Sequence, residues 1–321
     1  MTRYPYRGPV DAYQRTMRAK PAGAEGFPRT YQPVTRAPGV WQSGVFEPAL
    51  KQYPHAYAMG EPVFEDPAAG VRWRAARATA MYSVLAALAA APCGEHLVLR
   101  GSVLVRAWLG EQAREPGDLD FVVTPPTLTL TDAAGLFDGM VDAVRRFPPD
   151  PTGVLVDADE VAVEDIWTYE RAPGRRLVFP WLSPDLPAGT VQVDVVLGEE
   201  LPERPEVVDV PVGEHLVPVR AVSPQLSLAW KLLWLETDRY PQGKDLYDAT
   251  LLAEHATVPW DLVVSVLAKE LGDEAAGFTP ERVRRWAVDW DNLRDLAPGV
   301  PGTGPQWRDR LVAALRRSYP G

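Results

Sequence analysis

Strand patterns stop at Val219, and from Ser223-Pro224 onward the sequence is patterned for helices alone. A serine followed by proline is a strong helix start, because serine caps the first turn and proline fits its first position. Thr279-Pro280 repeats this device. Between Val71 and Val219 the pattern switches repeatedly between helix and strand. The sequence therefore predicts an α+β fold with a mixed-sheet lobe followed by a C-terminal helical lobe.

Individual elements follow from hydrophobic spacing and from the residues that start and stop helices and strands. Leu136, Met140 and Val144, for example, are spaced four apart and indicate one helix face. We expect helices at 71–91, 102–112, 132–146, 224–237, 244–256, 259–271, 280–296 and 305–317. We expect strands at 96–99, 118–123, 154–156, 166–169, 176–181 and 191–197, with a short extended piece at 216–219.

Residues 1–70 differ from the rest, since they hold ten prolines and seven glycines together with ten aromatic residues. Disordered linkers are poor in aromatics, so we expect an irregular arm that wraps on the main body. Residues 1–40 carry seven basic and two acidic side chains, and an arm that contacts RNA by charge and stacking is the alternative. The predicted division is an arm at 1–70, an α/β domain at 71–222 and a helical domain at 223–321.

Composition excludes several classes of protein. The formal charge is −10, which argues against a bulk binder of polyanions. Cys93 is the only cysteine, so the chain has neither a disulfide framework nor a cysteine-rich zinc site. The start of the chain lacks an apolar signal segment, and the longest apolar stretch, Met81–Cys93, is too short to span a bilayer. We therefore expect a cytoplasmic protein without a membrane role. The four histidines lie in no nucleophile context, which disfavours a serine or cysteine hydrolase.

A phosphate site is suggested by Gly101-Ser102, where a strand runs into a helix. Glycine permits close approach of the backbone, and a helix N-terminus presents free N–H groups and a positive dipole. Ser102 can add a hydroxyl. The alternative is an ordinary strand-to-helix turn.

Three aspartates are candidates for a metal site. Asp118 and Asp120 are two residues apart at the start of a strand, so their carboxylates share one face of it. Mg²⁺ is the ion that such a pair of carboxylates typically binds. Asp194 is a lone acid among valines, and a buried charge needs a partner. If the strands are neighbours, three carboxylates meet, as in two-metal phosphoryl transfer. The alternatives are solvated acids at the start of one strand and an Asp194 that faces water from an edge strand.

Lys231 is unusual because the chain has only five lysines and this one lies in a helix that is apolar nearly all round. A lysine there snorkels, pairs with an acid, or faces a cleft. We expect its partner to be Asp245 or the Asp118/Asp120 pair. If Lys231 serves a bound phosphate, its replacement by alanine should abolish activity and spare the fold. If it is only structural, the same change should lower the melting temperature and spare activity. We also expect Asp245 and Asp248 in a first helical turn, where either acid favours the helix dipole without any other role.

Together these segments resemble the AbiEii/AbiGii-type nucleotidyltransferases, which are polymerase β-like enzymes often found as toxins of toxin–antitoxin pairs. The resemblance extends from about Val71 to Ala256. It rests on motifs in a fixed order: Gly101-Ser102, Arg114, Asp118-Leu119-Asp120, Asp194, Pro224-Gln225 with Lys231, and Lys244-Asp245-Leu246-Tyr247-Asp248. Arg100 stands where the family frequently has another glycine.

The resemblance implies a polymerase β-like fold and transfer of a nucleotidyl group from an NTP. Asp118, Asp120 and Asp194 would hold Mg²⁺ or Mn²⁺, and Asp194 would help to deprotonate an acceptor hydroxyl. Gly101, Ser102, Arg114 and Lys231 would bind phosphates, and Asp245 would orient Lys231 or a metal-bound water. The implied acceptor is RNA such as tRNA, or a protein, and the implied partner is an antitoxin. Two alternatives stay open: phosphotransfer on the same scaffold, and a catalytically silent binding module.

Overall fold

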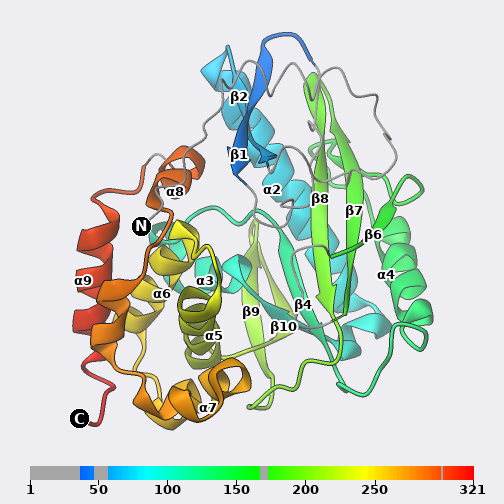
Figure 1. The fold of residues 1–321 in the computed structure, drawn as a ribbon. Coiled ribbons are helices and arrows are strands. Elements are labelled where there is room, and N and C mark those ends of the chain that lie inside the picture. The colour runs from blue at the N-terminus through cyan, green and yellow to red at the C-terminus, as the bar shows by residue number, and fades with distance from the viewer. Residues whose placement is uncertain (1–36, 47–56, 167–172, 298) are drawn as a thin grey trace. The chain divides into compact units, whose positions relative to one another are not determined.

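The computed structural model describes residues 37–46, 57–166, 173–297 and 299–321 (Figure 1). The chain forms two compact units that are interleaved in sequence: residues 1–91 with 129–195, and residues 92–128 with 196–321. This division differs from the predicted sequential one. The physical reason is that residues 92–128 pack against parts of the chain that come much later. They pair with a strand near Val219 and contact the C-terminal helices.

In the first unit, a pair of antiparallel strands precedes a long helix. β1 (Val40–Phe46) pairs with β2 (Tyr57–Phe64), so this part of the predicted irregular arm is a regular two-stranded sheet. The basic segment 1–36 lies outside the described residues. Helix α2 (Pro67–Ala90) begins earlier than predicted because Asp66 caps it, accepting hydrogen bonds from the backbone N–H groups of Ala68 and Ala69.

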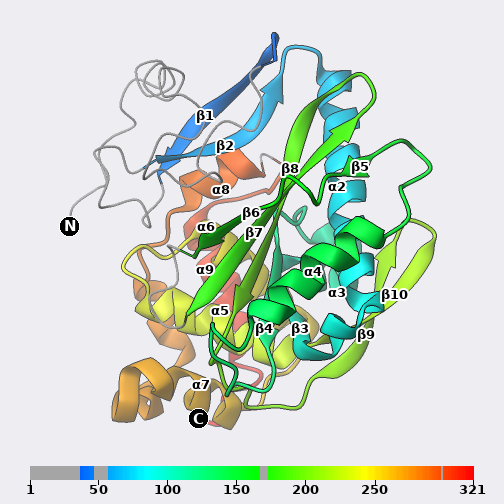
Figure 2. The ribbon, with the colours of Figure 1, turned by 90° about the vertical axis from the view of Figure 1, so that its right-hand side faces the viewer.

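The rest of this unit is one helix and four strands, namely α4 (Ala134–Arg146), β5 (Leu155–Val156), β6 (Ala162–Asp165), β7 (Gly174–Ser183) and β8 (Leu186–Val196). β7 lies between β5 and β8 and also pairs with β6, while α2 contacts α4 (Figures 1 and 2). Trp73 of α2 is 5.4 Å from Trp181 of β7, measured between ring centroids, and 5.8 Å from Phe64 of β2. This aromatic cluster joins helix, hairpin and sheet into one core. The strand predicted at 166–169 lies mostly outside the described residues, and β6 ends just before it.

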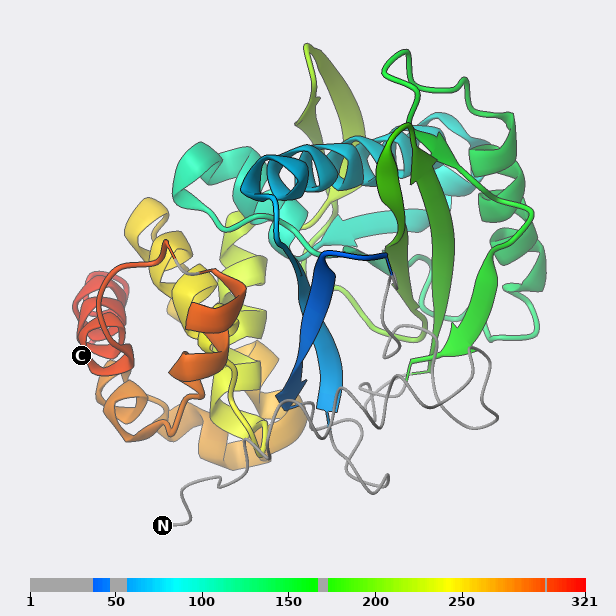
Figure 3. The same cartoon turned by 90° about the horizontal axis from the view of Figure 1, so that it is seen from above.

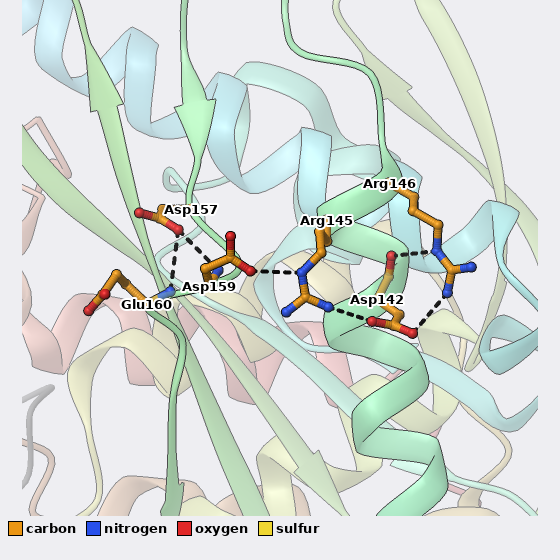
Figure 4. A network of polar contacts seen from close by, with 6 residues as sticks. All are labelled: Asp142, Arg145, Arg146, Asp157, Asp159 and Glu160. Atoms are coloured by element: carbon orange, nitrogen blue, oxygen red, sulfur yellow. Dashed lines mark hydrogen bonds and ion pairs between the residues drawn. The ribbon is translucent and has the colours of Figure 1, made fainter.

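Exposed ion pairs lie on the surface of this unit at the end of α4 (Figure 4). Arg145 Nε lies 2.8 Å from Asp159, and Arg146 Nη2 lies 3.0 Å from Asp142 one turn earlier. Asp157 accepts hydrogen bonds from the backbone N–H groups of Asp159 and Glu160. Exposed pairs of this kind contribute little to stability, because water and salt screen them. The cluster therefore fixes a loop rather than forming a site.

Four strands of mixed direction in the second unit follow the order β4-β3-β10-β9. These strands are β3 (Leu97–Arg100), β4 (Leu119–Val123), β9 (Glu206–Val212) and β10 (His215–Ala221). β3 is antiparallel to β4 and parallel to β10. β9 was missed in the sequence because its outer face carries the exposed Val207, which hides the alternation expected of a half-buried strand.

Helices make up the rest of the second unit: α3 (Ser102–Leu109), α5 (Pro224–Thr237), α6 (Gly243–His255), α7 (Trp260–Leu271), α8 (Trp290–Leu296) and α9 (Gly304–Leu315). α6 contacts α5, α9 and α3 (Figures 1 and 3). The helix predicted at 280–296 is wrong, since a 3₁₀ helix (Pro280–Arg285) is followed by an extended break and then α8. The break occurs because Asp289 bonds to Pro241 and to Gly243 through its backbone and caps α8 with its side chain.

The predicted α+β class is confirmed by this mixture of parallel and antiparallel strands with helices. Over the residues that the structure describes, none of the helices has the length and apolar character needed to cross a membrane.

Candidate active site

The turn from β3 into α3 is built for close approach of an acidic side chain. Gly101 has φ +85° and ψ −158°, a conformation that favours glycine. A Cβ atom at this position would collide with Oδ2 of Asp120, so the Asp120 carboxylate lies directly over the turn. The turn therefore needs glycine for two independent reasons.

Ser102 begins α3 and is 3% exposed. Its hydroxyl is buried and has no hydrogen-bond partner among the described residues. Gly101, as the N-cap, provides no side chain to accept from the first N–H groups of α3. A buried hydroxyl and an uncapped helix N-terminus at one turn are a chemical fit for an anion such as a phosphate.

We expect Gly101→Ala to impair both the fold and the site. The backbone conformation costs about 1–3 kcal/mol in a residue with a side chain, and the new methyl group must displace the Asp120 carboxylate. Thermal unfolding and nucleotide transfer per folded molecule measure the two effects. Gly110→Ala is the matched control, because Gly110 also has a positive φ of 57° at the other end of α3 but an added Cβ would meet nothing within 4 Å. Equal transfer by the two variants would contradict the proposed role of the turn.

Asp118 and Asp120 lie at the start of β4, and both are partly buried. Over its described residues, neither unit contains a group of three or more His, Cys, Asp or Glu side chains that could hold a metal by itself. A pair of carboxylates is nevertheless sufficient for Mg²⁺, which usually binds one or two carboxylates and completes its shell with substrate phosphates and water. The two aspartates therefore fit that ion when a nucleotide is bound.

Lys231 lies in the buried face of α5 and is 5% exposed. Its Nζ atom is 2.7 Å from Oδ1 of Asp245 and 3.4 Å from Oδ2 of Asp248, both on α6. The Trp234 ring centroid is 4.9 Å from the same nitrogen. The expected pairing with Asp245 is confirmed. The sequence offered the second acid, Asp248, as part of the Lys244–Asp248 motif but not as a partner of Lys231, although its spacing of three from Asp245 puts both on one helix face.

Arg114 extends this network from the segment before β4. Its Nη2 atom is 2.9 Å and its Nε atom 3.2 Å from the two carboxylate oxygens of Asp248, which is fully buried. This bidentate contact uses the planar fork of the guanidinium. A carboxylate is thus the partner of Arg114 in this structure, and its contact with phosphates stays a prediction.

Electrostatics keep the network charged. Burial disfavours the ammonium of Lys231, but the charges of Asp245 and Asp248 outweigh it and raise the pKa of the lysine. Burial likewise disfavours the Asp245 carboxylate, yet the Lys231 charge holds the pKa of that group below its usual value. Burial also opposes the charge of Arg114, whose pKa is raised by Asp248 and then by Asp118 and Asp245. The Asp118 carboxylate therefore interacts with the network.

Asp194 belongs to the first unit and is 8% exposed, so it does not face water from an edge strand. Both of its carboxylate oxygens accept from Arg176 at 2.7 Å, and Gln192 Nε2 donates to Oδ2 at 3.1 Å. The sequence showed that this buried charge needs a partner but not which residue supplies it. Asp118 and Asp120 belong to the other unit, so the convergence of all three aspartates stays a prediction.

Comparisons with known proteins identify the family to which the chain belongs. No curated protein matches the chain. The family model described as "Nucleotidyl transferase AbiEii toxin, Type IV TA system" matches residues 83–313, which includes the C-terminal helices beyond the predicted limit at Ala256. The match also covers Gly101-Ser102, both aspartates of β4, Asp194, Lys231 and Asp245. The chain belongs to the AbiEii family of nucleotidyltransferases, whose members are toxins of type IV toxin–antitoxin systems.

Proposed function

We propose that this enzyme is Mg²⁺-dependent and moves a nucleoside monophosphate from an NTP to an acceptor hydroxyl, with RNA such as tRNA as the acceptor. The observation that carries the proposal is the β3–α3 turn. There, a buried hydroxyl without a partner in the described part of the chain, an uncapped helix N-terminus and the Asp120 carboxylate lie together. Anion and metal sites at one turn are what a metal–triphosphate complex requires.

The chain's own residues have separate tasks in this reaction. Ser102 and the first N–H groups of α3 hold terminal phosphates of the NTP. Asp118 and Asp120 hold Mg²⁺, with Mn²⁺ as a substitute, and the ion neutralises charge on the triphosphate. The family resemblance implies that Asp194 helps to deprotonate the acceptor hydroxyl.

Lys231 supplies a fixed positive charge. An ammonium has three N–H donors; one donates to Asp245, and Asp248 lies 3.4 Å away as an ion pair. A further donor can serve a phosphate oxygen as negative charge develops on the leaving group. Asp245 orients the ammonium for that contact. Such preorganised charge is the main source of catalysis in phosphoryl transfer.

The family also implies an antitoxin, and we propose that the activity is exerted on cytoplasmic RNA and opposed by an antitoxin protein. A protein hydroxyl is the other class of acceptor consistent with the chemistry.

Ser102→Ala tests the phosphate site. Removing a buried hydroxyl that has no partner within the described segments costs little stability, so the melting temperature should not fall. The KM for NTP should rise, because a phosphate loses a donor. Ser227→Ala is the matched control, since Ser227 is also a buried serine whose hydroxyl lacks a partner among the described residues. Equal KM values for the two variants would count against phosphate binding by Ser102.

The reaction type is tested by incubating the protein with Mg²⁺, total RNA and NTPs labelled at the α or the γ phosphate. The proposal expects the α label on RNA and the γ label in released pyrophosphate. Transfer of the γ label would instead establish a phosphotransferase. If neither the α label nor the γ label appears on RNA or protein, a silent binding module is favoured.

A further inference from the structure

Arg100 is a buried cation beside the proposed metal site. It is the last residue of β3, directly before Gly101, and is 3% exposed. In the antiparallel pairing of β3 with β4, its register partner is Asp120. Side chains of directly opposed residues share one face of a sheet and interact. The guanidinium side chain therefore lies on the same face as a carboxylate to which the proposed function assigns Mg²⁺.

The position of Arg100 is fixed by three other side chains. Its Nη1 atom is 2.8 Å from Oε2 of Glu199. Its guanidinium carbon is 5.2 Å from the ring centroid of Trp230 and 5.8 Å from that of Trp234. Arginine suits this setting better than lysine, because its planar group binds a carboxylate and stacks on aromatic rings at the same time.

Trp234 connects Arg100 to the lysine network, since its indole also lies 4.9 Å from Nζ of Lys231. One ring therefore contacts two cations, one from the aspartate-bearing sheet and one from α5. Lys231 is in turn held by Asp245 and Asp248 on α6. Arg100 thus links the strand of Asp120 to the lysine that the proposed function directs at the triphosphate.

We propose that Arg100 is a positioning residue for nucleotidyl transfer. It holds the Asp120 carboxylate over the β3–α3 turn and keeps Trp234 packed against Lys231, so that metal-binding and phosphate-binding groups keep one geometry. Packing alone does not require a charge here, because hydrophobic residues of similar volume often replace buried ion pairs without loss of stability. This inference rests on the proposed function.

The test uses Arg100→Met, which keeps side-chain volume and removes the guanidinium. We expect kcat to fall about 10–100-fold, the range for loss of a group that orients a metal ligand, with a much smaller change in KM for NTP. Mn²⁺ binding, measured by electron paramagnetic resonance without turnover, should weaken by a similar factor. Arg310→Met is the matched control and should leave both quantities unchanged. Arg310 also contacts a carboxylate, Glu254, and an indole, Trp307, but lies on α9.

Two results would overturn the inference. One is Arg100→Met with kcat and Mn²⁺ affinity like the wild type. The other is a lower melting temperature with unchanged kcat per folded molecule, which would make Arg100 purely structural. If Arg100→Met does not fold, Glu199→Gln is used in its place. This variant keeps Arg100 and removes its charged partner. Its kcat and Mn²⁺ affinity then decide whether Arg100 is a positioning residue. An inactive wild-type protein would instead count against the proposed function, so the two failures are distinguishable.

Discussion

Replacing Asp120 with Asn is expected to lower nucleotidyl transfer by at least about 10³-fold while leaving the fold intact. A bound metal contributes several kcal/mol of charge stabilisation to phosphoryl transfer, and each 1.36 kcal/mol is a factor of ten in rate. Asn has the shape of Asp but lacks the charge that holds the ion. Asp120 lies over Gly101. The strand alternation predicts that Asp118 shares its face, so the same reasoning applies to Asp118→Asn.

The measurement is a single-turnover rate at saturating Mg²⁺ and NTP, with the melting temperature as a check on folding. Asp209→Asn serves as control, because Asp209 is an exposed aspartate on β9 of the same unit. A variant at Asp120 that transfers nucleotide as fast as the Asp209 control would remove the basis for the metal site.

Replacing Lys231 with Ala is expected both to destabilise the protein and to abolish transfer. For a lysine that serves the triphosphate, the sequence predicted that the fold would be spared, on the premise that the lysine charge had no ligand. The structure contradicts that premise, since Asp245 and Asp248 both contact the ammonium. Removing one partner of a buried ion pair typically costs about 3–5 kcal/mol, because it leaves an uncompensated charge.

A double replacement separates stability from catalysis. Lys231→Met combined with Asp245→Asn removes one positive and one negative charge, while Asp248 keeps its bidentate contact with Arg114. We expect the double variant to recover much of the unfolding free energy lost by Lys231→Met alone, but none of the transfer. Urea unfolding and transfer rates measured on the wild type, both single variants and the double variant complete the cycle. Recovery of both stability and transfer would make Lys231 structural.

Short-range patterns predicted much of the site. Two local signals were Gly101-Ser102 at a strand–helix junction and the alternation of Asp118 and Asp120. In the structure, Gly101 has a positive φ and lies against the Asp120 carboxylate. The pairing of Lys231 with Asp245 could be inferred from the cost of burying a charge in an apolar helix. Such arguments work because they need only the neighbours in sequence and the sign of a charge.

Partners that are distant in the chain could not be predicted in the same way. Arg176 is 18 residues from Asp194, and Arg114 is 134 residues from Asp248. Any of the chain's many arginines could supply the cation that buried Asp194 or Asp248 requires. Which arginine does so depends on how the strands and helices pack. The interleaved division into units has the same origin, since β3 and β4 are assigned by what they pack against rather than by their order.

We propose that the β3–α3 turn, Asp118 and Asp120 perform nucleotidyl transfer. The decisive measurement is pyrophosphate release by purified protein with Mg²⁺, RNA and NTP, run beside Asp120→Asn. We expect one pyrophosphate for each nucleotide added to RNA by the wild type, and neither product from Asp120→Asn. Nucleotide addition by Asp120→Asn at the wild-type rate, or transfer without pyrophosphate release, would contradict the proposal.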